Sequence, residues 1–137
     1  MRRTATALLI GLLLVAAPAF ATTYFVPGSY TTIQKALNAS KSGDVVQVSP
    51  GTYLENISVK AGVQLIGSGP ENTIIDGKAA YITVFVPYNA TSSTRVEGFT
   101  IRNGNYQKGG GLYFQSGATA VISNCHIQGN RATIRGG

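Results

Sequence analysis

Cysteine and histidine occur once each, as Cys125 and His126, in a chain of 137 residues. A single cysteine excludes an internal disulfide, so stability must come from a packed core even in an oxidising compartment. A single histidine cannot build a multi-histidine zinc site, and it offers no basis for a Ser-His triad. We therefore expect no metal ion and no cofactor.

Charged residues are also scarce, and acidic ones are the scarcer kind. The chain has eleven Lys and Arg residues against five Asp and Glu residues, for a net charge of +6. After Arg3 the basic residues stand singly, with no helix or loop that concentrates them. We therefore expect no nucleic-acid binding, whereas mild positive charge is compatible with anionic polysaccharide or lipid surfaces.

Only one long apolar run is present, at residues 7–17. It follows the basic start Arg2-Arg3 and precedes the small-residue motif Ala19-Phe20-Ala21, an order typical of a signal peptide. A membrane anchor is the alternative, but a spanning helix needs about 20 apolar residues and this run is shorter. We predict a signal peptide over residues 1–21 and cleavage after Ala21.

The mature chain, residues 22–137, is then exported to the periplasm, the cell surface or the extracellular space, with no transmembrane segment. Its 116 residues, the 137 of the chain less 21, suffice for one modest domain. Loss of Arg2 and Arg3 reduces the eleven basic residues to nine, so the mature net charge is about +4.

The mature chain repeats itself with an offset of 26 residues. Residues 96–111, VEGFTIRNGNYQKGGG, align with residues 122–137, ISNCHIQGNRATIRGG. The alignment places Ile101 opposite Ile127, and the same offset carries Ile75 to Ile101. A fixed period between about 20 and 50 residues indicates a solenoid or array.

Each period contains three short segments with alternating apolar residues, as strands require. We predict an all-β, right-handed, single-stranded parallel β-helix of about three coils plus an incomplete fourth. A meandering antiparallel sandwich is the alternative, but it would not require apolar positions to recur at a constant offset. From the N-terminus, the paired apolar positions are Val46 and Val48, Ile57 and Val59, Val63 and Leu65; Thr73 and Ile75, Val84 and Val86, Thr94 and Val96; Phe99 and Ile101, Leu112 and Phe114, Ala120 and Ile122; then Cys125 and Ile127.

One segment has a helical pattern. Ile33, Ala36 and Leu37 fall on one face of a helix that begins near Thr31 and ends before Ser42-Gly43. Thr31 and Gln34 have the spacing of a capping box. We expect this short N-terminal helix to cover the open apolar end of the first coil, because solenoids need terminal caps.

These segments resemble a known superfamily. Residues 31–77, TTIQKALNASKSGDVVQVSPGTYLENISVKAGVQLIGSGPENTIIDG, resemble the opening of the pectin-lyase-like right-handed β-helix superfamily. Residues 98–104, GFTIRNG, and 109–130, GGGLYFQSGATAVISNCHIQGN, resemble coils of its repeat-rich members, including polymorphic outer-membrane-type proteins. The resemblance implies the fold but no single activity, because superfamily members include lyases, hydrolases, esterases, adhesins and inert repeats.

Carboxylate chemistry finds little support. A glycosidase needs two carboxyl groups about 5 to 9.5 Å apart, and a calcium-dependent lyase needs several oxygen ligands around one ion. The repeat register instead places Asp76 beside Arg102, where we expect an exposed ion pair. The paired aspartates of polygalacturonases and the QDTL-type stretch of pectinesterases are absent from the sequence. We expect no catalytic residue among the five acids, which are Asp44, Glu55, Glu71, Asp76 and Glu97.

Other conspicuous residues have structural interpretations. Asp44 is expected in a turn, Cys125 in the core and His126 on the outside of its strand. The glycines at coil corners are expected where φ > 0 is needed; they are Gly67, Gly69, Gly77, Gly98 and Gly104.

Two aromatic residues are the candidate ligand contacts. If Val84 and Val86 face inward, Phe85 faces outward, and the same alternation turns Tyr113 outward. Their positions fall on adjacent coils, about 4.8 Å apart in strand spacing. Stacked aromatic rings can pack against a sugar ring, although a plain cross-strand pair is the simpler interpretation.

Three functional hypotheses follow. The first is a non-catalytic exported β-helix module of a surface or polysaccharide-contacting protein. The second is the N-terminal part of a polysaccharide lyase, hydrolase or pectinesterase-like enzyme without its catalytic coils, and the third is an adhesin-like passenger segment. Because Gly136-Gly137 aligns with the residues that precede a strand, we also expect a C-terminal truncation and self-association through an uncapped last coil.

Overall fold

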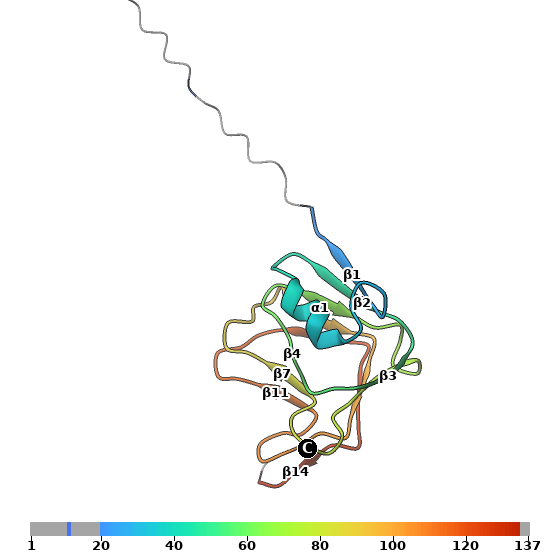
Figure 1. Ribbon diagram of the computed structural model, residues 1–137. Coiled ribbons are helices and arrows are strands. Elements are labelled where there is room, and N and C mark those ends of the chain that lie inside the picture. Colours follow the sequence, from blue (N-terminus) through green and yellow to red (C-terminus); the bar gives the residue numbers. More distant parts are fainter. Residues whose placement is uncertain (1–10, 12–19, 135–137) are drawn as a thin grey trace, which may run out of the picture.

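The computed structural model describes residue 11 and residues 20–134 (Figure 1). Most of the predicted signal peptide and the Gly136-Gly137 end therefore lie outside the described residues. Every strand pairing in the described part is parallel. The predicted fold class is confirmed: the chain is an all-β parallel solenoid of about four turns with a single short helix.

Three parallel sheets form the walls of the solenoid. The first sheet contains β1 (Thr23–Val26), β2 (Val45–Val48), β5 (Gln64–Ile66), β8 (Arg95–Glu97) and β12 (Val121–Ser123). The second contains β3 (Gly51–Leu54), β6 (Thr73–Asp76), β9 (Thr100–Arg102) and β13 (His126–Ile127). The third contains β4 (Ile57–Ser58), β7 (Val84–Val86) and β11 (Leu112–Phe114), and a further short pair joins β10 (Asn105–Tyr106) to β14 (Arg131–Ala132).

The core consists of columns of apolar side chains, one side chain from each coil. Ile75 pairs with Ile101, and Ile101 pairs with Ile127, so the column predicted from the offset of 26 is confirmed. Ile75 and Ile101 are fully buried, whereas Ile127 in the last described coil is 46 % exposed. The column is therefore closed to solvent in the middle coils and open at the last described coil.

The earliest coil differs from the prediction. Val46 and Val48 belong to β2 in the first sheet, where Val46 pairs with Leu65, so their assignment beside Ile75 is wrong. The partner of Ile75 is Tyr53 on β3. β3 has no alternating aliphatic pattern, because its inward position is a tyrosine whose hydroxyl donates to the Ser49 carbonyl at 2.8 Å.

The helix α1 (Ile33–Ala39) covers the first coil, as expected. Ile33, Ala36 and Leu37 are buried against the core, and α1 contacts β1, β2 and β4 (Figure 1). The N-cap is Thr32 rather than Thr31, and its side chain accepts from the Lys35 N–H at 3.2 Å. Within the part of the chain that the structure describes, no helix has the length and apolarity needed to cross a bilayer.

Coil corners have a left-handed backbone at two repeated positions. One is occupied by Asn103, with a φ of +54°, and by Gly129, 26 residues later, with a φ of +64°. At the other, Gly98 has a φ of +81°, and Asn124, which lies 26 residues later, has a φ of +46°. Glycine and asparagine adopt this region more readily than other residues. Gly67, Gly77 and Gly104 lie outside this region, so the prediction that these three glycines need φ > 0 is wrong.

Asp76 and Arg102 are neighbours on successive coils, as the register predicted. Arg102 Nε donates to Asp76 Oδ2 at 3.0 Å, and the Asn103 amide donates to the same oxygen at 2.9 Å. The Lys78 backbone N–H donates to Asp76 Oδ1 at 3.0 Å. Asp76 is only 6 % exposed, so the expectation of an exposed carboxylate is wrong; three donors replace the water that an exposed aspartate would bind.

We expect the fold to lose stability as pH falls below about 4, and Asp76→Asn to weaken that dependence. Burial raises the pKa of Asp76, but the hydrogen bonds from Lys78, Arg102 and Asn103 outweigh it and hold the pKa below its ordinary value of 3.8. A depressed folded pKa stabilises the fold above the unfolded pKa, and this contribution is lost as pH falls through the folded pKa. Thermal denaturation at a series of pH values measures the slope.

At neutral pH, Asp76→Asn should lower the free energy of unfolding by about 1 to 2 kcal/mol, because hydrogen bonds to a charged group are lost. Glu71→Gln is the control, since it removes one exposed carboxylate and should leave both stability and slope unchanged. Equal acid slopes in the wild type and Asp76→Asn would contradict the prediction. Some slope should remain in the variant, because two backbone hydrogen bonds also lower the pKa of Asp44.

Candidate functional site

The outer face of the third sheet carries the two predicted contact residues. Tyr113 on β11 is the register partner of Phe85 on β7. Their ring centroids are 6.0 Å apart and their planes differ by 11°, so the rings stack. Both side chains are partly exposed. The structure therefore brings the two predicted residues together, while their contact with a ligand stays a prediction.

Two further tyrosines extend this pair into a continuous surface. Tyr106 on β10 packs edge-on against Tyr113 with centroids 6.1 Å apart, and Tyr81 packs edge-on against Tyr106 at 4.8 Å. Tyr81 is 50 % exposed, and the neighbouring Tyr106 side chain raises its pKa, so the Tyr81 phenol stays protonated at neutral pH. We call Tyr81, Phe85, Tyr106 and Tyr113 the aromatic surface.

Tyr81 and Tyr106 were not predicted from the sequence. Both lie outside the three main strands of their coils, so the alternation that identified Phe85 gives no signal for them. The backbone brings them together, because the Asn105 N–H donates to the Tyr81 carbonyl at 2.9 Å. The only available signal was the aromatic character of two residues near the same corner of adjacent coils.

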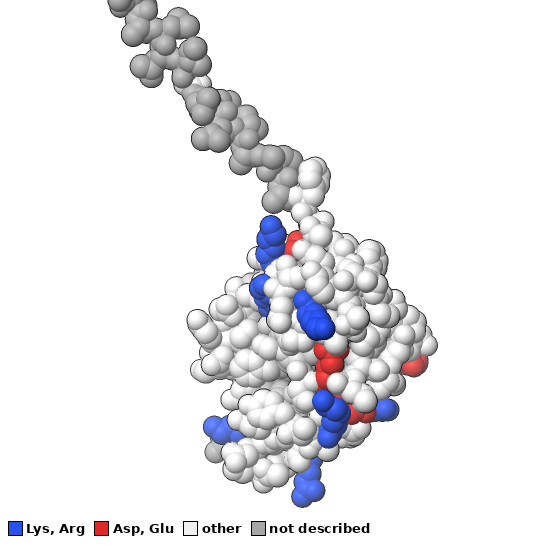
Figure 2. Space-filling model, viewed as in Figure 1, with Lys and Arg blue, Asp and Glu red and all other residues white. Residues whose placement is uncertain are grey.

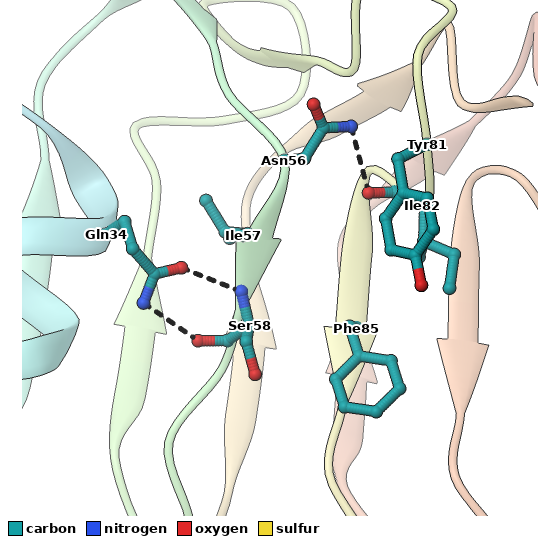
Figure 3. Close-up of a pocket in the computed structure, with 7 residues that line it drawn as sticks. All are labelled: Gln34, Asn56, Ile57, Ser58, Tyr81, Ile82 and Phe85. Carbon is teal, nitrogen blue, oxygen red and sulfur yellow. Dashed lines mark hydrogen bonds between the residues drawn. The ribbon is translucent and has the colours of Figure 1, made fainter.

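A groove of about 250 Å³ lies beside the aromatic surface. Figure 3 shows Tyr81 and Phe85 on one side of it and Gln34 of α1 on the other, with β4 between them. The residues that line the groove are Gln34, Asn56, Ile57, Ser58, Tyr81, Ile82 and Phe85. It is therefore a mixed apolar and polar cleft bounded by the capping helix and the third sheet.

The amide side chains of the groove are held in place. Gln34 Oε1 accepts from the Ser58 N–H at 2.8 Å, and Gln34 Nε2 donates to the Ser58 carbonyl at 3.4 Å. Asn56 Nδ2 donates to the carbonyls of Gly77 at 3.2 Å and Ile82 at 3.0 Å. These bonds to backbone fix the polar wall of the groove.

A second hollow of about 390 Å³ shares Gln34 and Ser58 with the groove and is lined also by Lys60. The Lys60 ammonium donates to the carbonyls of Asn38 and Ser40 at the C-terminal end of α1. A positive charge therefore lies beside the hollow that adjoins the groove. Elsewhere on the face in view, the basic side chains are dispersed rather than gathered into one patch (Figure 2).

Most of the five acidic residues have structural partners. Asp76 is described above, and Asp44 accepts the backbone N–H groups of Thr22 and Lys41 in a turn, as predicted. Glu55 accepts the N–H groups of Ile33 and Gln34 at the start of α1, at 2.9 and 3.0 Å. Glu97 pairs with Arg95 at 2.8 Å, and only Glu71 is exposed. No group of three metal-ligating side chains occurs among the described residues.

Cys125 and His126 lie on opposite sides of the last described coil. Cys125 packs against the core, and burial raises the pKa of its thiol, so the sulfur stays protonated at neutral pH. His126 is exposed on β13. Both placements agree with the sequence interpretation.

Comparison with known proteins agrees with this architecture. The sequence model of the pectinesterase family matches residues 24–135, a range that includes every strand from β2 to β14 and α1. No curated protein and no solved structure gives a significant match. Because the match covers most of the 137 residues and the fold is the parallel solenoid that the resemblance implied, the chain belongs to the pectinesterase family.

Proposed function

We propose that the chain is an exported, non-catalytic β-helix module that binds polysaccharide through its aromatic surface and the adjoining groove. The observation that carries the proposal is the stack of Phe85 on Tyr113, continued by Tyr106 and Tyr81. These aromatic side chains combine an apolar ring face with, in tyrosine, a polar hydroxyl, which suits the alternating apolar and hydroxylated faces of a sugar.

The shape of the site supports a sugar chain rather than a small apolar ligand. Rings from adjacent coils extend the surface along the solenoid, and the groove beside them presents amides that are already held by Ser58 and Ile82. An extended ligand can rest on several rings at once. Each aromatic contact is weak, so several must act together to hold such a chain.

Charge and family together favour an anionic polysaccharide. The mature chain predicted from the sequence is basic, at about +4, and Lys60 lines the hollow next to the groove. The family name denotes esterases of pectin, and family members are typically extracellular or cell-wall proteins. A pectic polysaccharide with free carboxylates is therefore the ligand class that we propose first.

A second candidate function is favoured by the family match itself. In this proposal the chain forms the N-terminal coils of an enzyme that hydrolyses pectin esters, and the aromatic surface binds substrate for catalytic groups elsewhere. Because both proposals place no catalytic group in this chain, neither expects methanol release from methyl-esterified pectin by the chain alone, and such turnover would contradict both. The downstream reading frame distinguishes the two, since further coils with a cluster of acidic residues would favour the second.

Binding should weaken at least tenfold when Phe85 and Tyr113 are both replaced by alanine, because the stacked pair supplies the central contact area. Affinity electrophoresis in gels containing polygalacturonate, methyl-esterified pectin or dextran measures the effect. Phe25→Ala is the matched control, since Phe25 is 52 % exposed on β1 in another sheet, and it should change affinity less than twofold. Binding that survives the double replacement would remove the proposal.

A further inference from the structure

Thr22 is fixed on both sides before β1 begins. Its N–H donates to Asp44 Oδ1 at 3.0 Å, and its carbonyl accepts from the Val45 N–H at 2.9 Å. The second bond extends the pairing of β1 with β2, in which Thr23 is the partner of Val45. The nitrogen of Thr22 is therefore held against the Asp44 carboxylate by the sheet itself.

Asp44 is a buried carboxylate held by backbone donors alone. It is 4 % exposed, and its other oxygen accepts from the Lys41 N–H at 2.9 Å. The hydrogen bonds from Thr22 and Lys41 lower its pKa, with smaller contributions from the charges of Lys41 and Lys60. Among the described residues, no Lys or Arg side chain forms a salt bridge with Asp44. A buried charge without a close counter-ion is costly.

The peptide bond between Ala21 and Thr22 is the one that the sequence predicts to be cut. We propose that this cleavage supplies the missing counter-ion: the new α-ammonium of Thr22 pairs with Asp44, and processing thereby stabilises the first coil. A peptidase that reads the small residues Ala19 and Ala21 adds water across the bond. The hydroxyl goes to the Ala21 carbonyl carbon and the proton to the Thr22 nitrogen, which is protonated again at neutral pH.

The geometry requires no rearrangement of the fold. The nitrogen that donates to Asp44 as an amide donates from the same place as an ammonium, with a full positive charge added. Phe20 is 86 % exposed, and Ala21 and Thr22 are exposed, so the bond is accessible. Phe20 and Ala21 also line a hollow of about 170 Å³ at Asp44. Cleavage removes both residues, so water can enter the hollow and accept hydrogen bonds from the other ammonium protons.

The test uses the full-length chain exported from a bacterial host, and the N-terminus of the recovered protein is read by mass spectrometry. A second version carries one glycine inserted between Ala21 and Thr22. After cleavage it keeps the Thr22 amide on Asp44 but moves the ammonium one residue away. We expect Thr22 as the first residue of the parent protein, and a Tm about 3 to 5 °C higher than that of the inserted version.

Asp44→Asn should abolish this difference in Tm, because the ammonium then has no carboxylate to pair with. If Asp44→Asn fails to fold, the difference in Tm between the parent and the inserted version is instead measured as a function of pH. The pairing raises the pKa of the ammonium, so its contribution is present below about pH 8 and is lost as pH rises through the folded pKa. Lys41 and Lys60 are present in both versions, so their charges do not contribute to the difference in Tm. A different N-terminus, or equal Tm values near neutral pH, would overturn the proposal.

Discussion

Ile101→Ala should lower the free energy of unfolding by about 3 kcal/mol. Ile101 is fully buried and stacks between Ile75 of the preceding coil and Ile127 of the following one. Removing buried side-chain carbons loses the transfer free energy and leaves a cavity, and such changes cost about 2 to 5 kcal/mol. The hydrogen bonds of β9 on both sides restrain the backbone, so the coil cannot close around the gap.

Ile127→Ala is the matched control, because it makes the same chemical change in the same column. Ile127 is 46 % exposed, so its replacement should cost only about 1 kcal/mol. Urea denaturation followed by circular dichroism gives both values. Equal losses in the two variants would mean that the column is not the continuous core that the register describes.

The difference between these two residues also shows what the sequence could predict. The offset of 26 placed Ile75, Ile101 and Ile127 in one column because each coil must present an equivalent side chain to the core. The offset carries no information on burial, which depends on what covers each coil. The exposure of Ile127 therefore could be read only from the structure.

Prediction was weakest in the first coil, for a physical reason. Neither β1 nor β3 has a strict aliphatic alternation. In β3, Tyr53 takes the inward position that isoleucine takes in β6 and β9. The capping helix also occupies sequence between β1 and β2, which breaks the spacing of the later coils. Periodicity identifies a coil only where its length is constant.

The candidate site also has a part that the sequence could predict and a part that it could not. Phe85 and Tyr113 were predictable, because strand alternation sets their outward direction and the offset sets their pairing. Tyr81 and Tyr106 were not, because the loops at that corner follow neither period. The groove depends on Gln34 of α1, whose position over β4 results from helix packing that no local pattern specifies.

Glycine is needed at the coil corners for two different reasons, backbone conformation and lack of space, which the sequence alone could not distinguish. Gly129 has a φ of +64° and open space around its Cα, so a side chain there is disfavoured by backbone conformation alone. Gly104 has an ordinary φ but is buried, and a Cβ there would overlap the Gly110 carbonyl and the Thr83 hydroxyl. Its exclusion of a side chain is therefore steric.

Gly104→Ala should cost about 3 kcal/mol or more, at the upper end of what overpacking usually costs. The backbone cannot move away, because Gly104 donates to Asn130 Oδ1 and accepts from the Arg131 N–H, both at 2.8 Å. Gly129→Ala should cost about 1 kcal/mol, the usual cost of a left-handed residue with a side chain. Thermal denaturation of the two variants measures the difference. A smaller loss for Gly104→Ala than for Gly129→Ala would show that backbone conformation, and not the close approach of adjacent coils, keeps glycine at this corner.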